Sequence, residues 1–290
     1  MTSCYRLAVA ILALCGCAPA MAQEAGDDGP ESRFVMDIDA STRADIVVGE
    51  HNLRVTVHPG EVVQVLDETA SDEEGRFHVG RDDFNFDGHV DLSTWAVVGQ
   101  VNQSVVVYLY DPADRRFHIL RTPDNAPVNC EGFWDLTPHA ELRLLTSSCR
   151  GGPMWFTDVY RFTPQGELYV YRSQRRIMSP LITGMLEFGT DDVPIASVWT
   201  TYDGAGNALD TWVGTDPLRP VPLMLTMAEP LGIRDMPGGF LLPVQLAAGE
   251  QVEVLDVSQE ENWMKVRIAG PAKRPAITGW VAVPGEGASP

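Results

Sequence analysis

The sequence predicts an all-β protein, and three observations support this fold class. Short runs of β-prone residues recur along the chain, separated by Gly, Pro, Asn and Asp. Neighbouring runs are joined by tight turns, as within Val159–Tyr171 and Val198–Asp210. Helical periodicity of useful length is lacking beyond the N-terminal segment. We therefore expect antiparallel strands arranged as a sandwich, a barrel or a propeller-like array.

The N-terminal segment has the features of an export signal. Arg6 precedes an apolar run over residues 7–14, and the small-x-small cleavage sequence Ala-Met-Ala follows at 20–22. We expect a signal peptide over residues 1–22 and a periplasmic mature chain. The residues around Cys17, Leu-Cys-Gly-Cys, resemble a bacterial lipobox. The alternative is therefore a lipid anchor at Cys17, which would be the protein's one attachment to a membrane.

Composition limits the partners of the chain. Its 40 acidic and 21 basic residues give a net charge of −19, which repels the phosphates of nucleic acids and anionic lipids. We therefore expect no nucleic acid partner, and a cationic partner fits the charge better. With 290 residues, 44% of them hydrophobic, the chain is long enough for two domains with sizeable cores.

A β-domain is predicted over residues 34–215, after a polar, acidic and flexible leader over residues 23–33. Its expected strands are Leu53–Val57, Val62–Leu66, Val105–Tyr110, Phe117–Leu120, Leu142–Thr146, Trp155–Phe162, Leu168–Tyr171, Ser197–Tyr202 and Ala208–Val213.

The segment Asp83-Phe-Asn-Phe-Asp-Gly-His-Val-Asp91 has the spacing of a calcium loop. In EF-hand loops, positions 1, 3, 5 and 9 supply side-chain oxygens, position 7 supplies a carbonyl, and position 6 is Gly. The corresponding ligands here are Asp83, Asn85, Asp87, Asp91 and the carbonyl of His89. Position 12 is Thr94 instead of Glu, so a further ligand must come from water or from a residue such as Asp82. Because the flanks are β-prone, we expect a structural Ca²⁺ site in a β-domain; the alternative is a turn that binds no ion.

The cysteines predict one disulfide. Cleavage after residue 22 removes three of the five cysteines and leaves Cys130 and Cys149. Two cysteines in an exported protein most often form a bridge, because the compartment is oxidising. The alternative is a pair of buried free thiols.

Prolines between residues 217 and 230 predict a linker over 216–228, followed by a small domain over 229–290. This domain contains Arg-x-x-Pro at 234–237, Asn-Trp-Met-Lys-Val at 262–266 and Gly-Trp-Val at 279–281, and it resembles the bacterial SH3 family. The resemblance implies a small barrel, and alternation predicts a core formed by Val252, Val254, Leu255, Val266 and Val281. Some such domains adhere to cell-wall peptide or glycan, while others only pack or dock.

No enzyme signature is present, so we expect a non-enzymatic protein. The sequence lacks a Gly-x-Ser-x-Gly elbow, a His-Glu-x-x-His zinc motif, a Walker loop and a dinucleotide fingerprint. Its six histidines are scattered. A pair of carboxylates assembled in three dimensions would suffice for a glycosidase, and this alternative stays open.

The calcium loop, the following strand Val105–Tyr110 and the segment around Asp158–Phe162 together resemble a family of bacterial periplasmic inhibitors. These calcium-binding, β-propeller-like proteins protect bacteria from peptidoglycan-hydrolase effectors delivered by type IV secretion systems. They are similar in fold to the I-type lysozyme inhibitors. The resemblance covers roughly residues 50–175 and implies an immunity protein, with the SH3-like domain as an addition.

Inhibitors of the lysozyme type insert a loop with Ser, Gly and an aromatic residue into the hydrolase cleft. The resemblance places this inhibitory loop at residues 147–155, with Tyr160 as a further aromatic candidate. Its expected contact residues are Ser148, Arg150, Gly151, Gly152, Trp155 and Tyr160. The alternative for Trp155 and Tyr160 is that they are alternating strand residues of the core. An arginine can pair with a catalytic carboxylate at two points, and a bridge at Cys149 would hold the loop in its bound shape.

These observations lead to one hypothesis and two alternatives. We expect an exported, calcium-stabilised inhibitor of a lysozyme-like peptidoglycan hydrolase. The first alternative is a cell-wall adaptor that binds peptidoglycan through its SH3-like domain, and the second is an uncharacterised glycan hydrolase.

Overall fold

The computed structural model describes residues 32–124, 126–186, 196–219, 221–268 and 276–283. Strands account for 54% and helix for 3% of the structure, which confirms the predicted all-β class. The predicted signal peptide, the lipobox at Cys17 and nearly all of the acidic leader lie outside the described residues. The described chain begins with a strand at Ser32, inside the range predicted for the leader.

The strands form four antiparallel sheets. Sheet 1 contains β1 (Ser32–Asp37), β2 (Arg43–Val48), β3 (Leu53–His58) and β4 (Val62–Leu66). Sheet 2 contains β5 (His78–Asp82), β6 (Asp91–Val98), β7 (Asn102–Asp111), β8 (Arg116–Ile119) and β9 (Phe133–Trp134). Sheet 3 contains β10 (Thr137–His139), β11 (Leu144–Gly151), β12 (Met154–Phe162), β13 (Leu168–Arg176), β14 (Ser197–Tyr202) and β15 (Ala208–Gly214). Sheet 4 contains β16 (Leu223–Thr226), β17 (Leu231–Arg234), β18 (Leu241–Leu246), β19 (Gln251–Val257), β20 (Trp263–Ile268) and β21 (Ile277–Ala282).

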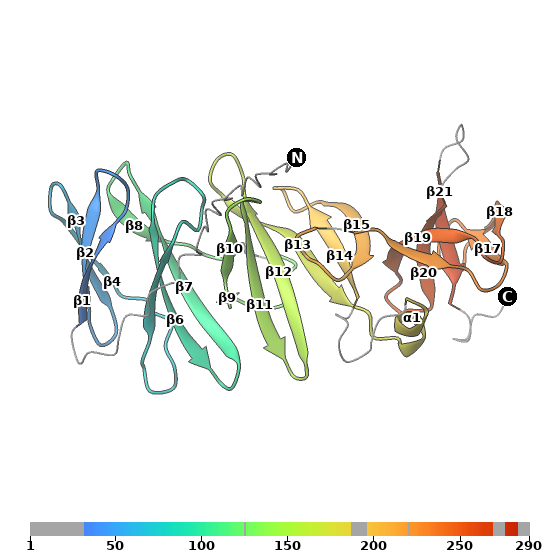
Figure 1. Cartoon of the computed structure of the whole chain (residues 1–290), viewed down its shortest axis with the longest axis horizontal. Helices are drawn as coiled ribbons and strands as arrows, with labels where there is room; N and C mark the ends of the chain where they lie inside the picture. The colour runs from blue at the N-terminus through green and yellow to red at the C-terminus, as the bar shows by residue number, and fades with distance from the viewer. Residues whose placement is uncertain (1–31, 125, 187–195, 220, 269–275, 284–290) are drawn as a thin grey trace, which may run out of the picture.

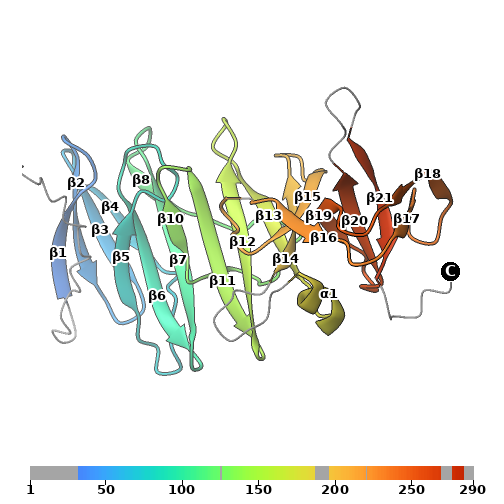
Figure 2. The same ribbon diagram turned by 45° about the vertical axis from the view of Figure 1, so that its right-hand side comes forward.

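The four sheets follow one another along the long axis of the molecule in chain order (Figures 1 and 2). Sheet 1 lies at one end and sheet 4 at the other, so the blade-like sheets form a row and no propeller ring closes. Within sheets 1 and 2, and from β10 to β15, each strand pairs with its neighbour in sequence, and β9 adds to β7. Tight turns make this pattern of hairpins possible.

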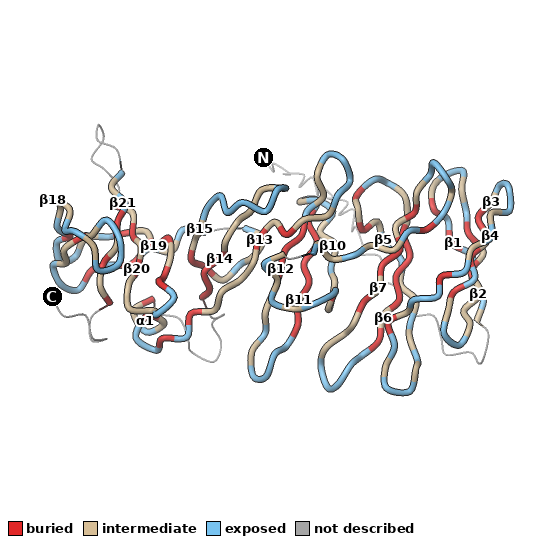
Figure 3. The backbone as a smooth tube through the Cα atoms, turned by 180° about the vertical axis from the view of Figure 1, so that it is seen from behind, coloured by how far each residue is buried: buried red, intermediate tan, exposed pale blue. Residues whose placement is uncertain are grey.

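Hydrophobic cores lie between successive sheets. One core joins sheet 1 to Leu92, Tyr108, Tyr110 and Phe117 of sheet 2. Residues of sheets 2 and 3 form the next core: Phe84, Phe86, Val105, Val107, Phe133, Leu145, Tyr160 and Val170. The third core spans β14, β15, helix α1 (Pro180–Met185) and sheet 4. In Figure 3 the buried segments run along the strands, and the connections at the strand ends are exposed.

Strand β7 explains why the run Val105–Tyr110 is apolar at every position. Val105 and Val107 point into the core shared with sheet 3, whereas Tyr108 and Tyr110 point into the core shared with sheet 1. Successive side chains of a strand point to opposite faces. A strand between two cores therefore needs apolar residues on both faces, and the sequence provides them.

The C-terminal part corrects two predictions. Residues 216–228, predicted to be a linker, contain strand β16, which pairs with β19, and the hydrophobic core continues from sheet 3 into sheet 4. Sheet 4 has the strand order β16-β19-β20-β21-β17-β18, and its two outer strands are not paired with each other. The small barrel that the SH3 resemblance implies is therefore not closed. Its predicted core is confirmed, because all five of the predicted core residues are buried: Val252, Val254, Leu255, Val266 and Val281.

A bulge explains how Val254 and Leu255, adjacent residues of β19, are both buried. The pairing of β19 with β20 shifts register between Val254 and Asp256, so the strict alternation of faces is broken at this point. The short helix α1 also has a local cause, because Ser179 caps its N-terminus and Pro180 occupies its first turn.

The cores between sheets should carry much of the stability. Leu145 is completely buried between sheets 2 and 3, whereas Leu209 is 63% exposed. We predict that Leu145→Ala lowers the free energy of unfolding by about 2–5 kcal/mol, because it leaves a cavity. The matched control Leu209→Ala should change it by less than about 0.5 kcal/mol. Urea unfolding of both variants tests this, and equal small effects would contradict it.

Candidate functional site

The predicted calcium loop connects β5 to β6, at the edge of sheet 2 that faces sheet 3. Its backbone turns sharply, with left-handed φ angles of +93° at Gly88 and +61° at Phe86. Glycine adopts this conformation without steric cost, which explains Gly88 at position 6. The rings of Phe84 and Phe86 are buried in the core between sheets 2 and 3, so they anchor the loop.

The side-chain oxygens of the loop curl inward and accept backbone N–H groups. Asp83 accepts from Asp87 at 3.0 Å and from Gly88 at 2.9 Å. Asn85 accepts from Asp87 at 3.1 Å, and Asp87 accepts from His89 at 2.8 Å. The loop therefore holds two carboxylates and an amide oxygen near one another on its concave side.

Asp91 is the buried member of the loop. Its side chain is completely buried and accepts N–H groups from Phe84 at 2.9 Å and from Tyr110 at 2.8 Å. Burial raises the pKa of Asp91 to about 7, opposed by these two hydrogen bonds and supported by the charges of Asp87 and Asp83. A buried carboxylate close to two like charges favours a bound cation, which would compensate the negative charge.

The loop is also attached to sheet 1. His89 Nδ1 lies 3.1 Å from Asp39 Oδ2, and the N–H of Val90 donates to the carbonyl of Ile38 at 2.9 Å. Hydrogen bonds from the backbone and hydroxyl of Ser41 lower the pKa of Asp39 to about 2, so this residue is a carboxylate. The side chain of His89 is thus occupied, and its backbone carbonyl is the group that a cation could use.

Thr94, at position 12 of the loop, and Asp82, the possible further ligand, both form hydrogen bonds within the protein. Thr94 is buried, and its hydroxyl accepts the N–H of Ala70 at 2.9 Å. Asp82 is exposed and accepts the N–H of Asp83 at 2.8 Å. The hydroxyl of Thr94 is therefore engaged in the fold, whereas Asp82, like Asp83 and Asp87, has further lone pairs that a cation could use, and water is the other source of ligands.

A second acidic cluster lies at the turn between β7 and β8. Asp111, Asp114 and His118 have ligand atoms within 4.8 Å of one another, and all three residues are exposed. In the described part of the chain, no other group of three His, Cys, Asp or Glu residues is so compact, and the carboxylates of the calcium loop lie farther apart. The loop nevertheless offers a larger oxygen set, because an amide and a carbonyl accompany its carboxylates.

The predicted inhibitory loop is a β-hairpin. Ser147, Ser148 and Cys149 belong to β11, and Trp155 belongs to β12. The hydroxyl of Ser147 is buried and hydrogen-bonded to the backbone of Trp134, and the hydroxyl of Ser148 bonds that of Thr157 at 2.9 Å. Ser148 is thus engaged within the hairpin, and the tip beyond it is still paired, Arg150 with Trp155 and Gly151 with Met154.

The tip of the hairpin, residues 150–155, is exposed and held in place. Asn102, at the β6–β7 turn, accepts the N–H of Arg150 at 2.7 Å and donates to its carbonyl at 3.2 Å. The turn places Gly152 at a φ of +60°. Arg150 is exposed, its Nε donates to the carbonyl of Gly152 at 3.0 Å, and Trp155 is 42% exposed.

Tyr160 does not belong to this surface. Its side chain is completely buried in the core between sheets 2 and 3, where its ring packs edge-on against Phe133 at 5.5 Å. Burial strongly raises the pKa of its hydroxyl. The assignment of Tyr160 to the inhibitory loop was therefore wrong, because this part of β12 lies inside the stack of sheets, where three consecutive residues, Asp158, Val159 and Tyr160, are buried.

The disulfide Cys130–Cys149 is confirmed, with a Cα–Cα distance of 6.4 Å. It ties β11 to the segment before β9, and Asp158 of β12 strengthens the same attachment. Asp158 is buried and accepts the backbone and side-chain N–H groups of Asn129, each at 2.9 Å. The base of the hairpin is therefore fixed by a covalent bond and by a buried carboxylate.

Two positioning residues, Asn102 and Asp158, were not predicted from the sequence. An Asn in a turn is ordinary, and its contact with Arg150 joins residues far apart in the chain. Asp158 stands among β-prone residues of β12. An acidic residue within an apolar strand is unusual, and this was the one signal in the sequence that could have indicated its role.

No protein-family model matches the chain, and no curated protein or solved structure is significantly similar to it. In the part of the chain that the structure describes, no helix is long and apolar enough to span a membrane.

The attachment at Asp158 should depend on pH. Burial raises the pKa of Asp158 above its ordinary value of 3.8, although hydrogen bonds from Asn129 and Cys130 oppose this shift. The native state therefore holds this proton at a higher pH than the unfolded state does. Its contribution to stability is complete below the ordinary pKa and is lost as the pH rises through the raised value.

We predict that Asp158→Asn, which does not ionise, removes this loss. The difference in unfolding free energy between the variant and the wild type should shift in favour of the variant as the pH rises above about 4. Urea unfolding at a series of pH values measures this difference. A difference that is constant with pH would rule out a raised pKa at Asp158.

Proposed function

We propose that this protein is an exported, non-enzymatic inhibitor of a peptidoglycan hydrolase, and that the tip of the β11–β12 hairpin contacts the enzyme. The observation that supports this proposal most is the combination of exposure and rigidity at residues 150–155. An exposed tip that is fixed at its base suits insertion into a concave site.

The side chains of the tip have the appropriate chemistry. Arg150 can bind a carboxylate of the hydrolase with two parallel hydrogen bonds. Trp155 provides a large apolar surface beside it, and Trp and Arg are the residues most often found at the energetic centre of an interface. Gly151 and Gly152 carry no side chain that would keep the backbone of the tip away from the walls of a cleft.

Rigidity lowers the cost of binding. A loop that is mobile before binding loses conformational entropy in the complex, and a loop already in its bound shape loses less. Here the disulfide, the Asp158–Asn129 hydrogen bonds and the Asn102–Arg150 hydrogen bonds restrict the hairpin. The net charge of −19 would in addition accelerate association with a basic hydrolase.

We also propose a structural Ca²⁺ in the loop of residues 83–91, held by Asp83, Asn85, Asp87, the His89 carbonyl and Asp91. The charge of Asp91, buried beside Asp83 and Asp87, is the main support for a cation. The ion would stabilise sheet 2, because Asp91 begins β6 and bonds β7. The β6–β7 turn in turn holds the hairpin through Asn102, so Ca²⁺ would act on the inhibitory tip indirectly.

A second candidate function is a cell-wall adaptor that uses sheet 4. The turn between β17 and β18 exposes three large apolar side chains close together in sequence: Met236, Phe240 and Leu241 are 59%, 84% and 63% exposed. Exposed apolar residues in a cluster favour a binding surface. We place the adaptor second because exposed apolar side chains favour contact with another protein at least as well as contact with a glycan.

The first test is affinity capture from the periplasm and secreted fraction of the native organism, followed by wall-lysis assays with the captured hydrolase. We predict stoichiometric inhibition that Arg150→Ala and Trp155→Ala each weaken by at least tenfold, the loss typical of a central interface residue. The matched control Arg54→Ala, an exposed arginine of β3, should inhibit like the wild type.

Two outcomes would contradict the inhibitor proposal. Capture of wall fragments without a hydrolase, lost in Phe240→Ser, would favour the adaptor. Turnover of wall fragments by the purified protein would favour an enzyme.

The calcium proposal has its own test. Because a ligand that binds only the native state stabilises it, Ca²⁺ at a hundred times its Kd should add about 2.7 kcal/mol to the unfolding free energy. We predict that chelation removes this stabilisation and that Asp87→Ala no longer responds to Ca²⁺. Two variants serve as controls, His118→Ala in the second acidic cluster and Asp124→Ala at an exposed site, and both should respond normally. Thermal melts with Ca²⁺ and with chelator measure the response, and an unchanged wild-type melt would exclude the site.

A further inference from the structure

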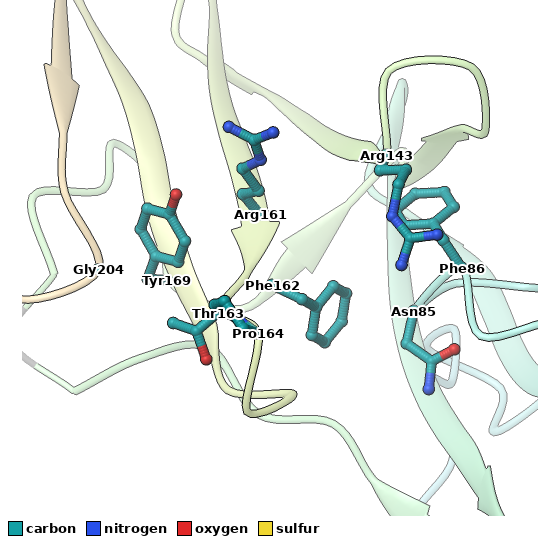
Figure 4. A pocket seen from close by; sticks show the side chains of 9 residues that line it. All are labelled: Asn85, Phe86, Arg143, Arg161, Phe162, Thr163, Pro164, Tyr169 and Gly204. Carbon is teal, nitrogen blue, oxygen red and sulfur yellow. The ribbon is translucent and has the colours of Figure 1, made fainter.

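A groove opens where the calcium loop of sheet 2 meets the turns of sheet 3 (Figure 4). Its volume is about 470 Å³, a size that suits a small molecule. The groove is lined by Asn85, Phe86, Arg143, Arg161, Phe162, Thr163, Pro164, Tyr169 and Gly204. These residues come from the loop after β5, the turn before β11, the β12–β13 hairpin and the β14–β15 turn, so sheet stacking alone creates this site.

The groove contains two arginines without acidic partners. Among the described residues, no carboxylate forms an ion pair with Arg143 or Arg161, although the chain has 40 acidic and only 21 basic residues. Four described arginines form such pairs, Arg76, Arg121, Arg175 and Arg267, and the other described arginines do not. Arg143 and Arg161, which are both exposed, are distinguished by lining the same groove. Two unpaired cations in the same groove of an acidic protein favour an anionic ligand.

Aromatic rings surround these cations. The guanidinium of Arg143 lies over the ring of Phe86 at 5.8 Å, and that of Arg161 lies over the ring of Tyr171 at 5.2 Å. In Figure 4 the ring of Phe162 extends toward Asn85 and the guanidinium of Arg143, and Tyr169 stands beside Arg161. The rings orient the guanidinium groups and leave apolar surface in the groove.

The backbone on both sides of the groove is held in an unusual conformation. Arg143 and Phe86 have φ angles of +51° and +61°, a left-handed conformation that is unfavourable for a residue other than glycine. The N–H of Arg143 donates to the carbonyl of Ala140 at 3.2 Å, which fixes this turn. Glycine would remove the cost at either position. A glycine would, however, lack the side chains that face each other here, the guanidinium of Arg143 and the ring of Phe86, which lie 5.8 Å apart.

We propose that this groove binds a carboxylated sugar. The guanidinium of Arg143 would bind the carboxylate, and Arg161 would add a second positive charge. The rings of Phe162 and Tyr169 provide apolar surface for the C–H face of a pyranose. A simple anion would use the arginines and leave the rings exposed, and an uncharged sugar would leave the arginines unpaired.

This inference does not rest on the proposed inhibitor function, because it concerns other residues. The hairpin tip is formed by residues 150–155, and none of them lines the groove. Failure of the inhibition test would therefore leave this proposal intact, and failure of the sugar test would leave the inhibitor proposal intact.

The test uses three probes that divide the ligand into its parts. N-acetylmuramic acid has a pyranose ring with a lactyl carboxylate, N-acetylglucosamine has the ring without the carboxylate, and lactate has the carboxylate without the ring. Titration calorimetry or ligand-observed NMR on the full chain should detect the first probe with an affinity at least tenfold above that of either part.

Variants then locate the site. Arg143→Ala should weaken binding of N-acetylmuramic acid by about tenfold or more, the loss typical of a charge-assisted hydrogen bond. Arg143→Lys should retain part of the affinity because it keeps the charge. Tyr169→Ala should weaken binding through lost ring contact, and Arg54→Ala is the control that should not change it. Thermal melts identify any variant that fails to fold. If Arg143→Ala does not fold, Arg161→Ala tests the role of the arginines in its place.

Four outcomes would overturn the proposal. Equal affinities for N-acetylmuramic acid and N-acetylglucosamine would show that the arginines do not bind the carboxylate. Equal affinities for N-acetylmuramic acid and lactate would show that the aromatic rings do not bind the pyranose. Wild-type binding by both Arg143→Ala and Arg161→Ala would place the ligand elsewhere. Displacement of the sugar by inorganic phosphate or by a short acidic peptide at lower concentration would assign the groove to that ligand.

Discussion

The burial of both faces of sheet 2 is the constraint on which the rest of the structure depends. Strand β7 sends Val105 and Val107 into one core and Tyr108 and Tyr110 into the other, so a single strand links sheets 1 and 3. Sheet 3 repeats this arrangement with sheet 4. Each sheet therefore covers an apolar face of its neighbour, and the row of sheets is stable without closing into a ring. The ends of such a row need polar outer faces, as in other stacked proteins.

This stacking also determines where chemistry can be placed. Strands fill the interior of the row, so the functional candidates lie in the turns at the sheet edges, which tolerate polar residues and special backbone angles. The calcium loop, the hairpin tip and the arginine groove all lie along the contact between sheets 2 and 3. Phe86 contributes to the core and lines the groove, and Asn102 joins the β6–β7 turn to Arg150. The proposed functions thus share one mechanical support, and loosening that contact would disturb all three.

Two buried carboxylates fix this support, and they do so in different ways. Asp158 is satisfied by Asn129 and stands beside a disulfide, so its environment is complete within the protein. Asp91 accepts two N–H groups but lies near the charges of Asp83 and Asp87. Like charges close to a buried carboxylate are unfavourable unless a proton or a cation compensates them. Acidic residues on the surface are stabilised by water, whereas these buried acids need specific partners to offset the free-energy cost of their burial.

The sequence by itself determined the all-β class, the nine expected strands, the disulfide and the core of the C-terminal sheet, because alternation and turn residues are local properties. The β-strand over Trp155–Phe162 was predictable, and it allowed two interpretations of Tyr160, as a contact residue or as a core residue; the packing of sheets 2 and 3 decided for the core. Only the tertiary structure decided that β16 joins sheet 4, that Asn102 holds Arg150, and that Arg143 and Arg161 share a groove. These contacts connect residues far apart in the chain, and they follow from the stacking of sheets, which no local pattern specifies.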